Sequence, residues 1–248
     1  MNHLTILPGH DKDLCPERFD PIELEPGDLC AIAGNTGSGK SRLIKDIEQL
    51  ANADSVTGRR ILLDGASVLP AGRLPVSGNL VAHLSQNMRF VLDLTVRDFL
   101  TLHCRCRGKS ALAPQTIIDT ANTVTPEPVR LEESLNLLSG GQSRALMIAD
   151  IALVCDSPIV LIDEIENAGI DKKKALCLLA GARKLVLIVT HDPHTALMAP
   201  RRIIMQNGAV RAVLSRTSEE NRIFSDLDRI YEKQTALQAK LRKGEFLL

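Results

Sequence analysis

One stretch constrains the fold of this chain more than any other, the segment 34–41, which reads GNTGSGKS. It follows the apolar run 29–33, LCAIA, so a buried strand, a glycine-rich turn and a helix are expected in that order. Such a turn places backbone N–H groups around phosphate oxygens and points the positive end of a helix at them. The stretch therefore predicts a phosphate-binding loop within an α/β fold.

The residue types in this stretch suit that chemistry. Glycines let the backbone approach an anion without a Cβ in the way, Lys40 is placed to reach the β- and γ-phosphates, and the Ser41 hydroxyl can ligate Mg²⁺. A plain glycine turn with an exposed lysine is the alternative, which the complete match in this context disfavours. The expected nucleotide-binding residues are Gly34, Asn35, Thr36, Gly37, Ser38, Gly39, Lys40 and Ser41.

Length and charge limit the class of protein. The 248 residues suffice for one large domain, or for one domain with a subdomain. The 30 basic and 30 acidic residues balance, which gives no overall basic field and argues against nucleic acid as a partner. We read no membrane span and no secretory signal, so a cytoplasmic protein is expected.

The cysteines are scattered, and several lie in apolar runs where a reduced thiol acts as a small hydrophobic group. The one local cluster of metal-ligand types is His103, Cys104 and Cys106. It lacks a second ligand pair at matching spacing, so a structural metal site is not expected there.

Apolar runs without polar interruption recur along the chain, separated by helical patterns, and they predict a parallel sheet covered on both faces. Ligands gather at the carboxyl ends of such strands. Two acids, Asp163 and Glu164, follow the run 159–162, His191 follows the run 185–189, and Gln86 follows the run 79–85. We therefore expect these polar residues near the phosphate loop.

The remaining segments predict the outlying elements. Residues 1–28 read as short edge strands and turns, residues 94–137 as a helical insertion, and residues 202–214 as a hairpin. Residues 215–248 read as a charged amphipathic helix that packs on its own domain. Lys172, Lys173 and Lys174 read as a solvated helix face.

A second glycine turn opens a helix at Leu138 to Gln142, which reads LSGGQ. This is a second anion-binding helix N-terminus in one chain. Since one triphosphate needs only one such site, the second turn is expected to serve the nucleotide of a neighbouring molecule.

In this order the motifs resemble those of the ATP-binding cassette (ABC) ATPases over about residues 1–215. The resemblance implies an α/β fold, a RecA-like P-loop NTPase core with an antiparallel β subdomain and a helical signature subdomain. We expect an ABC ATPase domain over 1–214, its helical subdomain over about 87–138, and a C-terminal amphipathic helix over 215–248.

The resemblance also implies the site. Bound ATP and Mg²⁺ would lie between two subunits of a head-to-tail dimer, with Ser139, Gly140, Gly141 and Gln142 of one facing the phosphate loop of the other. The implied catalytic residues are Glu164, which polarises the attacking water, His191 and Gln86. The implied metal-binding residues are Ser41, Gln86 and Asp163, and Asp171 is expected to couple the two sites.

Two functions from different classes follow. The first is Mg²⁺-dependent ATP hydrolysis that energises a separate membrane permease, with contacts expected in residues 87–103, at Phe90, Val91 and Leu92. The alternative is a soluble ABC ATPase that remodels or activates a protein partner or acts on nucleic acid. The link 165–170 favours this alternative, because it lacks the proline common in transporters and is one residue longer. A regulatory cassette without turnover is disfavoured by Glu164 and His191.

Overall fold

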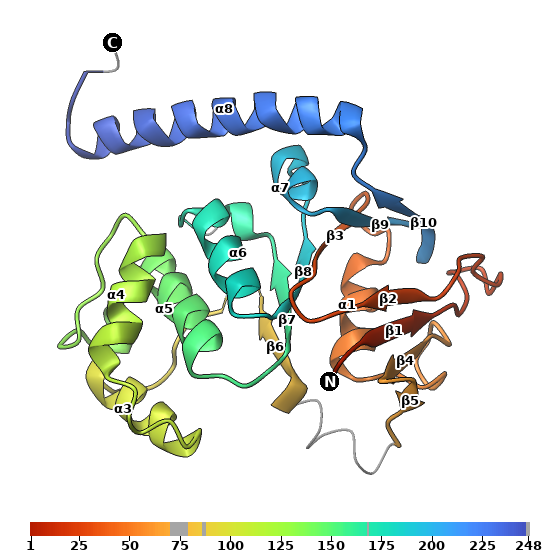
Figure 1. Cartoon of the computed structure of the whole chain (residues 1–248), viewed down its shortest axis with the longest axis horizontal. Coiled ribbons are helices and arrows are strands. Elements are labelled where there is room, and N and C mark those ends of the chain that lie inside the picture. Colours follow the sequence, from red (N-terminus) through yellow and green to blue (C-terminus); the bar gives the residue numbers. More distant parts are fainter. Residues whose placement is uncertain (70–78, 86–87, 168, 247–248) are drawn as a thin grey trace.

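The computed structural model describes residues 1–69, 79–85, 88–167 and 169–246. The larger of its sheets has the strand order β10-β9-β3-β8-β7-β6 (Figure 1). Strands β9, β3, β8, β7 and β6 run parallel, and β10 pairs back on β9 through the predicted hairpin. The bounds are β3 Leu29–Ala33, β6 Val81–Leu84, β7 Ile159–Asp163, β8 Leu185–Val189, β9 Arg201–Gln206 and β10 Ala209–Ser215.

Helices cover both faces of this sheet, as the unbroken apolar strands predicted. The covering helices are α1 (Lys40–Glu48) on one face and α5 (Gly140–Leu153) and α6 (Lys172–Gly181) on the other. The side chains of β7 alternate between two cores: Val160 and Ile162 pack with α5 and α6, whereas Ile159 and Leu161 pack with α1. The sheet is therefore held from both sides, and its carboxyl edge remains for ligands.

A four-stranded antiparallel sheet in the order β2-β1-β4-β5 forms the β subdomain. Its strands are β1 Leu4–Leu7, β2 Ile22–Leu24, β4 Arg60–Leu63 and β5 Ala66–Ser67. The prediction of edge strands within residues 1–28 is wrong for β1, which pairs with β2 on one side and β4 on the other. Leu4 and Ile6 are fully buried, and this core contact places β1 inside the sheet.

The predicted helical insertion is present between β6 and β7. Its elements are α3 Val96–Cys106, α4 Pro114–Val124 and the 3₁₀ turn η1 Leu135–Leu137. The Thr95 side chain accepts a hydrogen bond from the Asp98 N–H and so caps α3, while Pro114 occupies the first turn of α4, where a missing N–H costs nothing. These helices pack on α5 through buried residues such as Leu100 and Ile117.

His103 contacts Asp150, a residue outside the sequence cluster of His103, Cys104 and Cys106. Its Nδ1 lies 2.8 Å from Asp150 Oδ1, and Cys155 Sγ donates to the same carboxyl group at 3.5 Å. Arg107 Nε donates to His103 Nε2 at 3.3 Å, which leaves the ring proton on Nδ1, facing Asp150. The imidazole is therefore satisfied by protein groups on both nitrogens, and it joins α3 to the end of α5.

The C-terminal helix α8 (Ser218–Arg242) lies across α6 and α7 (Pro193–Met198) in Figure 1. Thr217 and Glu220 form a capping box at its start. Its inner side is polar and aromatic: His194 of α7 stacks 5.6 Å from Phe224 and 4.9 Å from Tyr231, measured between ring centroids. The helix thus packs on its own domain, as expected.

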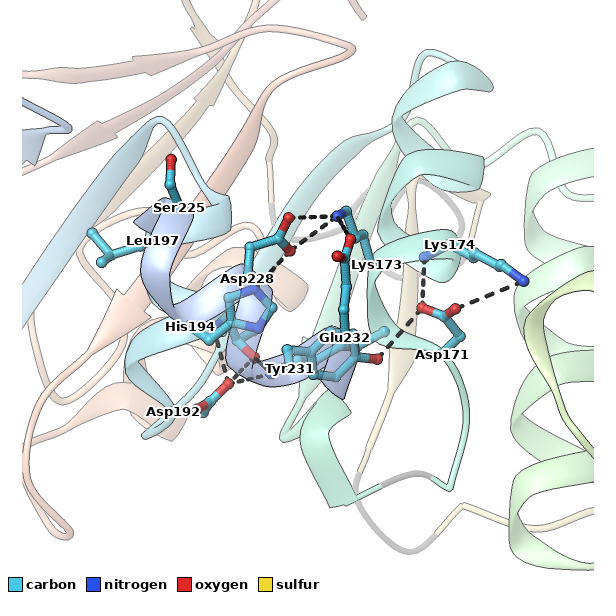
Figure 2. A network of polar contacts seen from close by, with 12 residues as sticks. Asp171, Lys173, Lys174, Asp192, His194, Leu197, Ser225, Asp228, Tyr231 and Glu232 are labelled. Carbon is cyan, nitrogen blue, oxygen red and sulfur yellow. Dashed lines mark hydrogen bonds and ion pairs between the residues drawn. The ribbon is translucent and has the colours of Figure 1, made fainter. Parts of the chain in front are cut away.

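The prediction that Lys172, Lys173 and Lys174 form a solvated face is wrong for Lys172, whereas the side chain of Lys173 is 38% exposed but paired with α8. Lys172 is only 6% exposed, and its Nζ bonds Asp192 and lies 4.9 Å from the centre of the Tyr231 ring. Lys173 Nζ donates to Asp228 of α8 at 2.7 Å (Figure 2). The sequence alone does not indicate these contacts, because the acidic partners of Lys172 and Lys173 lie 20 or more positions away along the chain.

Among the described residues, no helix combines the length and the apolarity that crossing a bilayer requires.

Candidate functional site

The segment between β3 and α1 forms the predicted loop. Gly34 and Gly39 have φ of 152° and 105°, in the region that favours glycine, and Gly39 occupies the N-cap position of α1. A Cβ on Gly34 would lie 2.4 Å from Met205 O and 2.6 Å from Ser38 Oγ. Only glycine fits at position 34, so the loop conformation is encoded by this residue rather than imposed by a ligand.

The β9–β10 hairpin supports the loop from one side. Gly208 N donates to Ser38 O at 2.8 Å, and a Cβ on Gly39 would lie 2.8 Å from Gly208 Cα. A cavity of about 390 Å³ opens beside the loop, lined by Gly34, Asn35, His191 and Arg202 among others. The hairpin contact therefore supports the backbone of the loop at Ser38 and Gly39.

Lys40 starts α1 and folds back over the loop. Its Nζ donates to Gly34 O at 2.7 Å and to Asn35 O at 3.1 Å, and the residue is 7% exposed. Burial lowers the pKa of Lys40, and the charges of Asp163 and Glu164 oppose that shift. The ammonium group is therefore held by the loop carbonyls and is subject to the charges of the acids at the end of β7.

Asp163 ends β7, and Glu164 follows it with φ of 49°, an uncommon value for a residue with a side chain. The Glu164 N–H donates to Val189 O at 3.0 Å, so the acid is anchored to the neighbouring strand β8. Burial raises the pKa of Asp163, and the adjacent Glu164 charge raises it further. Strained backbone and crowded carboxylates at one strand end are typical of functional sites.

His191 lies two positions after the end of β8; its side chain is 44% exposed, and its Nε2 lies 3.7 Å from Glu164 Oε1. The preceding Thr190 is held by its N–H, which donates to Ile32 O at 3.2 Å. The strand ends of β3, β7 and β8 thus bring the phosphate loop, the acid pair and His191 to one edge of the sheet, as predicted.

The second glycine turn is well formed but lies elsewhere. The Ser139 side chain accepts from the Gln142 N–H at 3.2 Å, and the Ser139 N–H donates to Gln142 Oε1 at 2.9 Å, a capping box for α5. Ser139 Oγ also donates to Glu127 Oε2 at 2.6 Å. In Figure 1, α5 and α1 lie on opposite sides of β7 and β8, so the turn does not face the phosphate loop of its own chain.

Comparison with known proteins connects these features. The family described as ABC transporter matches residues 21–167. An uncharacterised ABC transporter ATP-binding protein of Methanocaldococcus jannaschii is 45% identical over 249 residues, covering 100% of this chain and 95% of that protein. The chain belongs to the ABC transporter family.

Solved structures agree with the fold of an ABC ATPase. An ATP-binding cassette dimer bound to ADP and Pi aligns with a TM-score of 0.60 at 22% identity, covering 86% of this chain and 98% of that one. The cbiO1 protein of Clostridium perfringens, part of an ABC transporter complex, aligns with a TM-score of 0.65 at 19% identity, covering 95% and 96%. Both show that the core and its subdomains have the ABC arrangement that the sequence predicted.

Asp171, one of the site residues that the ABC resemblance implied, lies at the start of α6. Asp171 caps α6 by accepting from the Lys174 N–H at 3.1 Å, and its own N–H donates to Val124 O at 2.8 Å. Gln86 lies outside the described residues. Gly140 and Gly141 open α5 behind Ser139, and a Cβ on Gly169 would lie 3.8 Å from Gly141 Cα.

Sequence reasoning missed two cations that this ABC fold brings to the site. Lys12, from the loop after β1, donates to Gly37 O at 2.7 Å. Arg144 of α5 is 6% exposed and donates to Ser85 O at 3.2 Å. Burial lowers the pKa of Arg144, while the charges of Asp163 and Glu164 oppose that shift. These residues were not singled out from the sequence, because their partners lie 25 and 59 positions away along the chain.

Phe19 is the only Phe, Tyr or Trp that precedes the phosphate loop in the sequence. It packs partly buried against the core of α1 and the β subdomain. Among the described residues, it does not line the cavity beside the phosphate loop. Contact with an adenine base is therefore assigned to no residue here.

The acid stability of the chain should depend on Asp192, next to His191. Burial raises its pKa, but hydrogen bonds from Lys172 and Thr195 outweigh burial and lower the pKa from 3.8 to about 2. The carboxylate therefore stabilises the fold above about pH 4, and this contribution of at most about 2 kcal/mol is lost as pH falls toward 2. Urea unfolding at pH 5 and pH 2.5 should show a smaller acid loss in Asp192→Asn than in the parent protein. Equal losses would contradict the assignment.

Proposed function

We propose that the chain binds and hydrolyses ATP in a Mg²⁺-dependent reaction, as one subunit of a head-to-tail dimer, and energises a separate membrane permease. One observation carries this: the phosphate loop, the acid pair Asp163 and Glu164, and His191 all lie at one edge of the sheet, with His191 Nε2 3.7 Å from Glu164 Oε1. Phosphoryl transfer depends on positioning and charge neutralisation, which such an arrangement supplies.

The residues at the loop fit a nucleotide with its metal. Ser38 Oγ is buried and has no hydrogen-bond partner among the described residues, although it faces the loop. The hydroxyl of Ser41 and the carboxylate of Asp163 are oxygen ligands of the kind that Mg²⁺ prefers, and we assign Gln86 to the same shell. Bound Mg²⁺ would neutralise charge on the phosphates.

The side chains around the loop have distinct roles in this proposal. Lys40 and the loop N–H groups of 34–41 hold the phosphates by charge and hydrogen bonds. Glu164 accepts the proton of the attacking water, and its anchored backbone fixes the direction of the carboxylate. His191 donates to the γ-phosphate, and Gln86 senses its presence.

A second subunit completes the site. Ser139, Gly140, Gly141 and Gln142 lie away from their own phosphate loop, yet they form an intact anion-binding helix N-terminus. The structural relative bound to ADP and Pi is a dimer. We therefore place this turn against the nucleotide of a second copy, with Asp171 coupling the two sites.

The permease assignment rests on a face of the helical subdomain. Met88, Val91 and Leu92 are 37%, 90% and 44% exposed, whereas Phe90 turns inward and packs at 5.1 Å from Phe99 between ring centroids. The relative in Methanocaldococcus jannaschii is an ABC transporter ATP-binding protein. We assign 1–214 to the ABC ATPase domain, with a helical subdomain over about 87–138, and place the protein at the cytoplasmic face of a membrane.

Affinity purification from detergent-solubilised native membranes tests whether the chain associates with a permease. The tagged parent chain should recover a polytopic membrane protein in stoichiometric amount. Val91→Asp should recover at least about 10-fold less, because a charge in a buried apolar contact is costly. Leu14→Asp is the matched control, since Leu14 is a 73% exposed apolar residue of the β subdomain. Recovery of only a soluble enzyme or nucleic acid would favour the alternative, a soluble remodelling ATPase.

A further inference from the structure

Glu166 joins the two loops that carry Glu164 and His191. Its Oε1 accepts a hydrogen bond from Thr190 Oγ1 at 2.8 Å and another from the His191 N–H at 3.3 Å. Thr190 Oγ1 in turn accepts from the Asp192 N–H at 3.0 Å. One carboxylate oxygen therefore organises the backbone of the whole turn after β8.

The backbone before Glu166 is also fixed by its surroundings. Glu166 lies in the 3₁₀ turn η2 (Ile165–Asn167), and the preceding Ile165 is 1% exposed in the core shared with α5 and α6. The Glu164 N–H is bonded to Val189 O at 3.0 Å. The backbone is thus fixed on both sides of Glu164, and the side chain of Glu166 closes the link to the His191 turn.

The other oxygen of this carboxylate argues against a purely stabilising role. Glu166 Oε2 is buried and has no hydrogen-bond partner among the described residues. The residue also borders a cavity of about 630 Å³ below α8, together with Asp171 and Tyr231. Leaving a buried carboxylate oxygen unsatisfied costs free energy, and a neutral acceptor could stabilise the same turn without that cost. Such costs are retained at functional sites.

We propose that Glu166 is a positioning residue for His191: its Oε1 holds the His191 turn in register with Glu164, so that the imidazole meets the γ-phosphate in the geometry needed for hydrolysis. This inference rests on the proposed ATPase function. It assigns a role to Glu166, which lies two positions after Glu164 and accepts hydrogen bonds from the turn after the neighbouring strand β8.

The kinetic test separates positioning from catalysis. Glu166→Ala should lower kcat by about 10- to 100-fold, since small displacements of a group at the reacting centre cost that much. The KM for ATP should change less than about 2-fold, because the phosphate loop supplies most of the binding. Glu166→Gln keeps the Oε1 acceptor and should retain kcat within about 3-fold. If Gln is as damaging as Ala, Glu166 is itself a proton acceptor and the positioning role is wrong.

Amide hydrogen exchange in the nucleotide-free protein gives a readout independent of turnover. The N–H groups of His191 and Asp192 should lose protection in Glu166→Ala and keep it in Glu166→Gln. Thr190→Val, which removes only the hydroxyl, should expose the Asp192 N–H and leave that of His191 protected. Glu132→Ala is the control, because Glu132 is 73% exposed and pairs with Arg97 on the helical subdomain.

The outcomes distinguish the two proposals. If Glu166→Ala loses amide protection but the parent protein shows no ATPase activity, the positioning contact is supported and the proposed hydrolysis is rejected. Unchanged protection in Glu166→Ala would reject the positioning contact, whatever the activity. Should the alanine variant fail to fold, Glu166→Gln and Thr190→Val still decide the matter, since a Gln variant with low kcat or a Thr190→Val variant with full Asp192 protection overturns the inference.

Discussion

Glu164→Gln is expected to lower the kcat of ATP hydrolysis by at least about 100-fold, because the amide cannot accept the proton that general-base catalysis removes from water. The affinity for ATP should stay within about 3-fold, since Lys40 and the loop N–H groups are unchanged. Single-turnover hydrolysis and equilibrium binding of ATP, measured on the same preparations, test both parts.

The same variant should accumulate a closed dimer. With hydrolysis blocked and binding intact, two ATP molecules remain between the phosphate loops and the Ser139 turns, so size-exclusion chromatography with ATP and Mg²⁺ should show a dimer that the Lys40→Ala variant does not form. Glu132→Gln is the matched control, an acid-to-amide change at a 73% exposed side chain of the helical subdomain. Undiminished hydrolysis in Glu164→Gln would overturn the general-base role.

The stability of this variant provides a further check on its fold. Asp163 has a raised pKa because of burial and because of the neighbouring Glu164 charge. Removing that charge relieves like-charge repulsion at the end of β7 but also removes its attraction to Lys40 and Arg144, so the free energy of unfolding of Glu164→Gln in urea should stay within about 1 kcal/mol of the parent value. Lost activity together with stability in this range assigns the effect to chemistry and not to misfolding.

Much of the fold could be predicted because its determinants are local. The run 185–189 is apolar at every position and its side chains enter two cores, which is what an interior parallel strand requires. Gly34 and Gly39 have backbone conformations that favour glycine, so residues adjacent in the sequence determine the conformation of the phosphate loop. His191 could be assigned because it closely follows a strand of this kind.

The missed features depend on contacts between distant parts of the chain. Lys172 looked solvated, yet its partner Asp192 lies 20 positions away and Tyr231 comes from α8. Lys12 donates a hydrogen bond to Gly37 of the phosphate loop, which lies 25 positions further along the chain. The role of Glu166 depends on Thr190, a residue of the neighbouring strand end. Such pairings follow from how the elements pack, which periodicity does not encode.

Arg59→Met is expected to lower the free energy of unfolding by about 3–5 kcal/mol, because it leaves buried acids without their counter-charge. Arg59 is fully buried, and its guanidinium donates to Glu17 Oε1 at 2.6 Å, Glu17 Oε2 at 2.9 Å and Asp46 Oδ2 at 3.1 Å. Glu17 and Asp46 are 8% and 1% exposed, so water cannot replace the lost donors. Urea unfolding of the two proteins measures the difference.

The position of Arg59 explains why a phosphate-binding protein retains this buried cluster. Its Nη2 also donates to Gly208 O at 2.6 Å, Asp46 belongs to α1, and Gly208 N supports the phosphate loop at Ser38 O. The cluster thus joins the β subdomain, the helix after the loop and the hairpin beside it. Arg59→Met should therefore weaken ATP binding as well as stability.

Further variants test whether the loss of stability in Arg59→Met comes from uncompensated buried charge or from lost packing. Arg97→Met removes an arginine whose side chain is 53% exposed in its pair with Glu132, and it should cost less than about 1 kcal/mol. Combining Arg59→Met with Glu17→Gln and Asp46→Asn should recover part of the stability, since it removes the uncompensated charges. The amide oxygen at position 46 can still accept from Thr57 Oγ1, and the one at position 17 from either Gly9 N or Val210 N, but not from both. If the triple variant is no more stable than Arg59→Met, the loss comes from missing packing and hydrogen bonds rather than from buried charge.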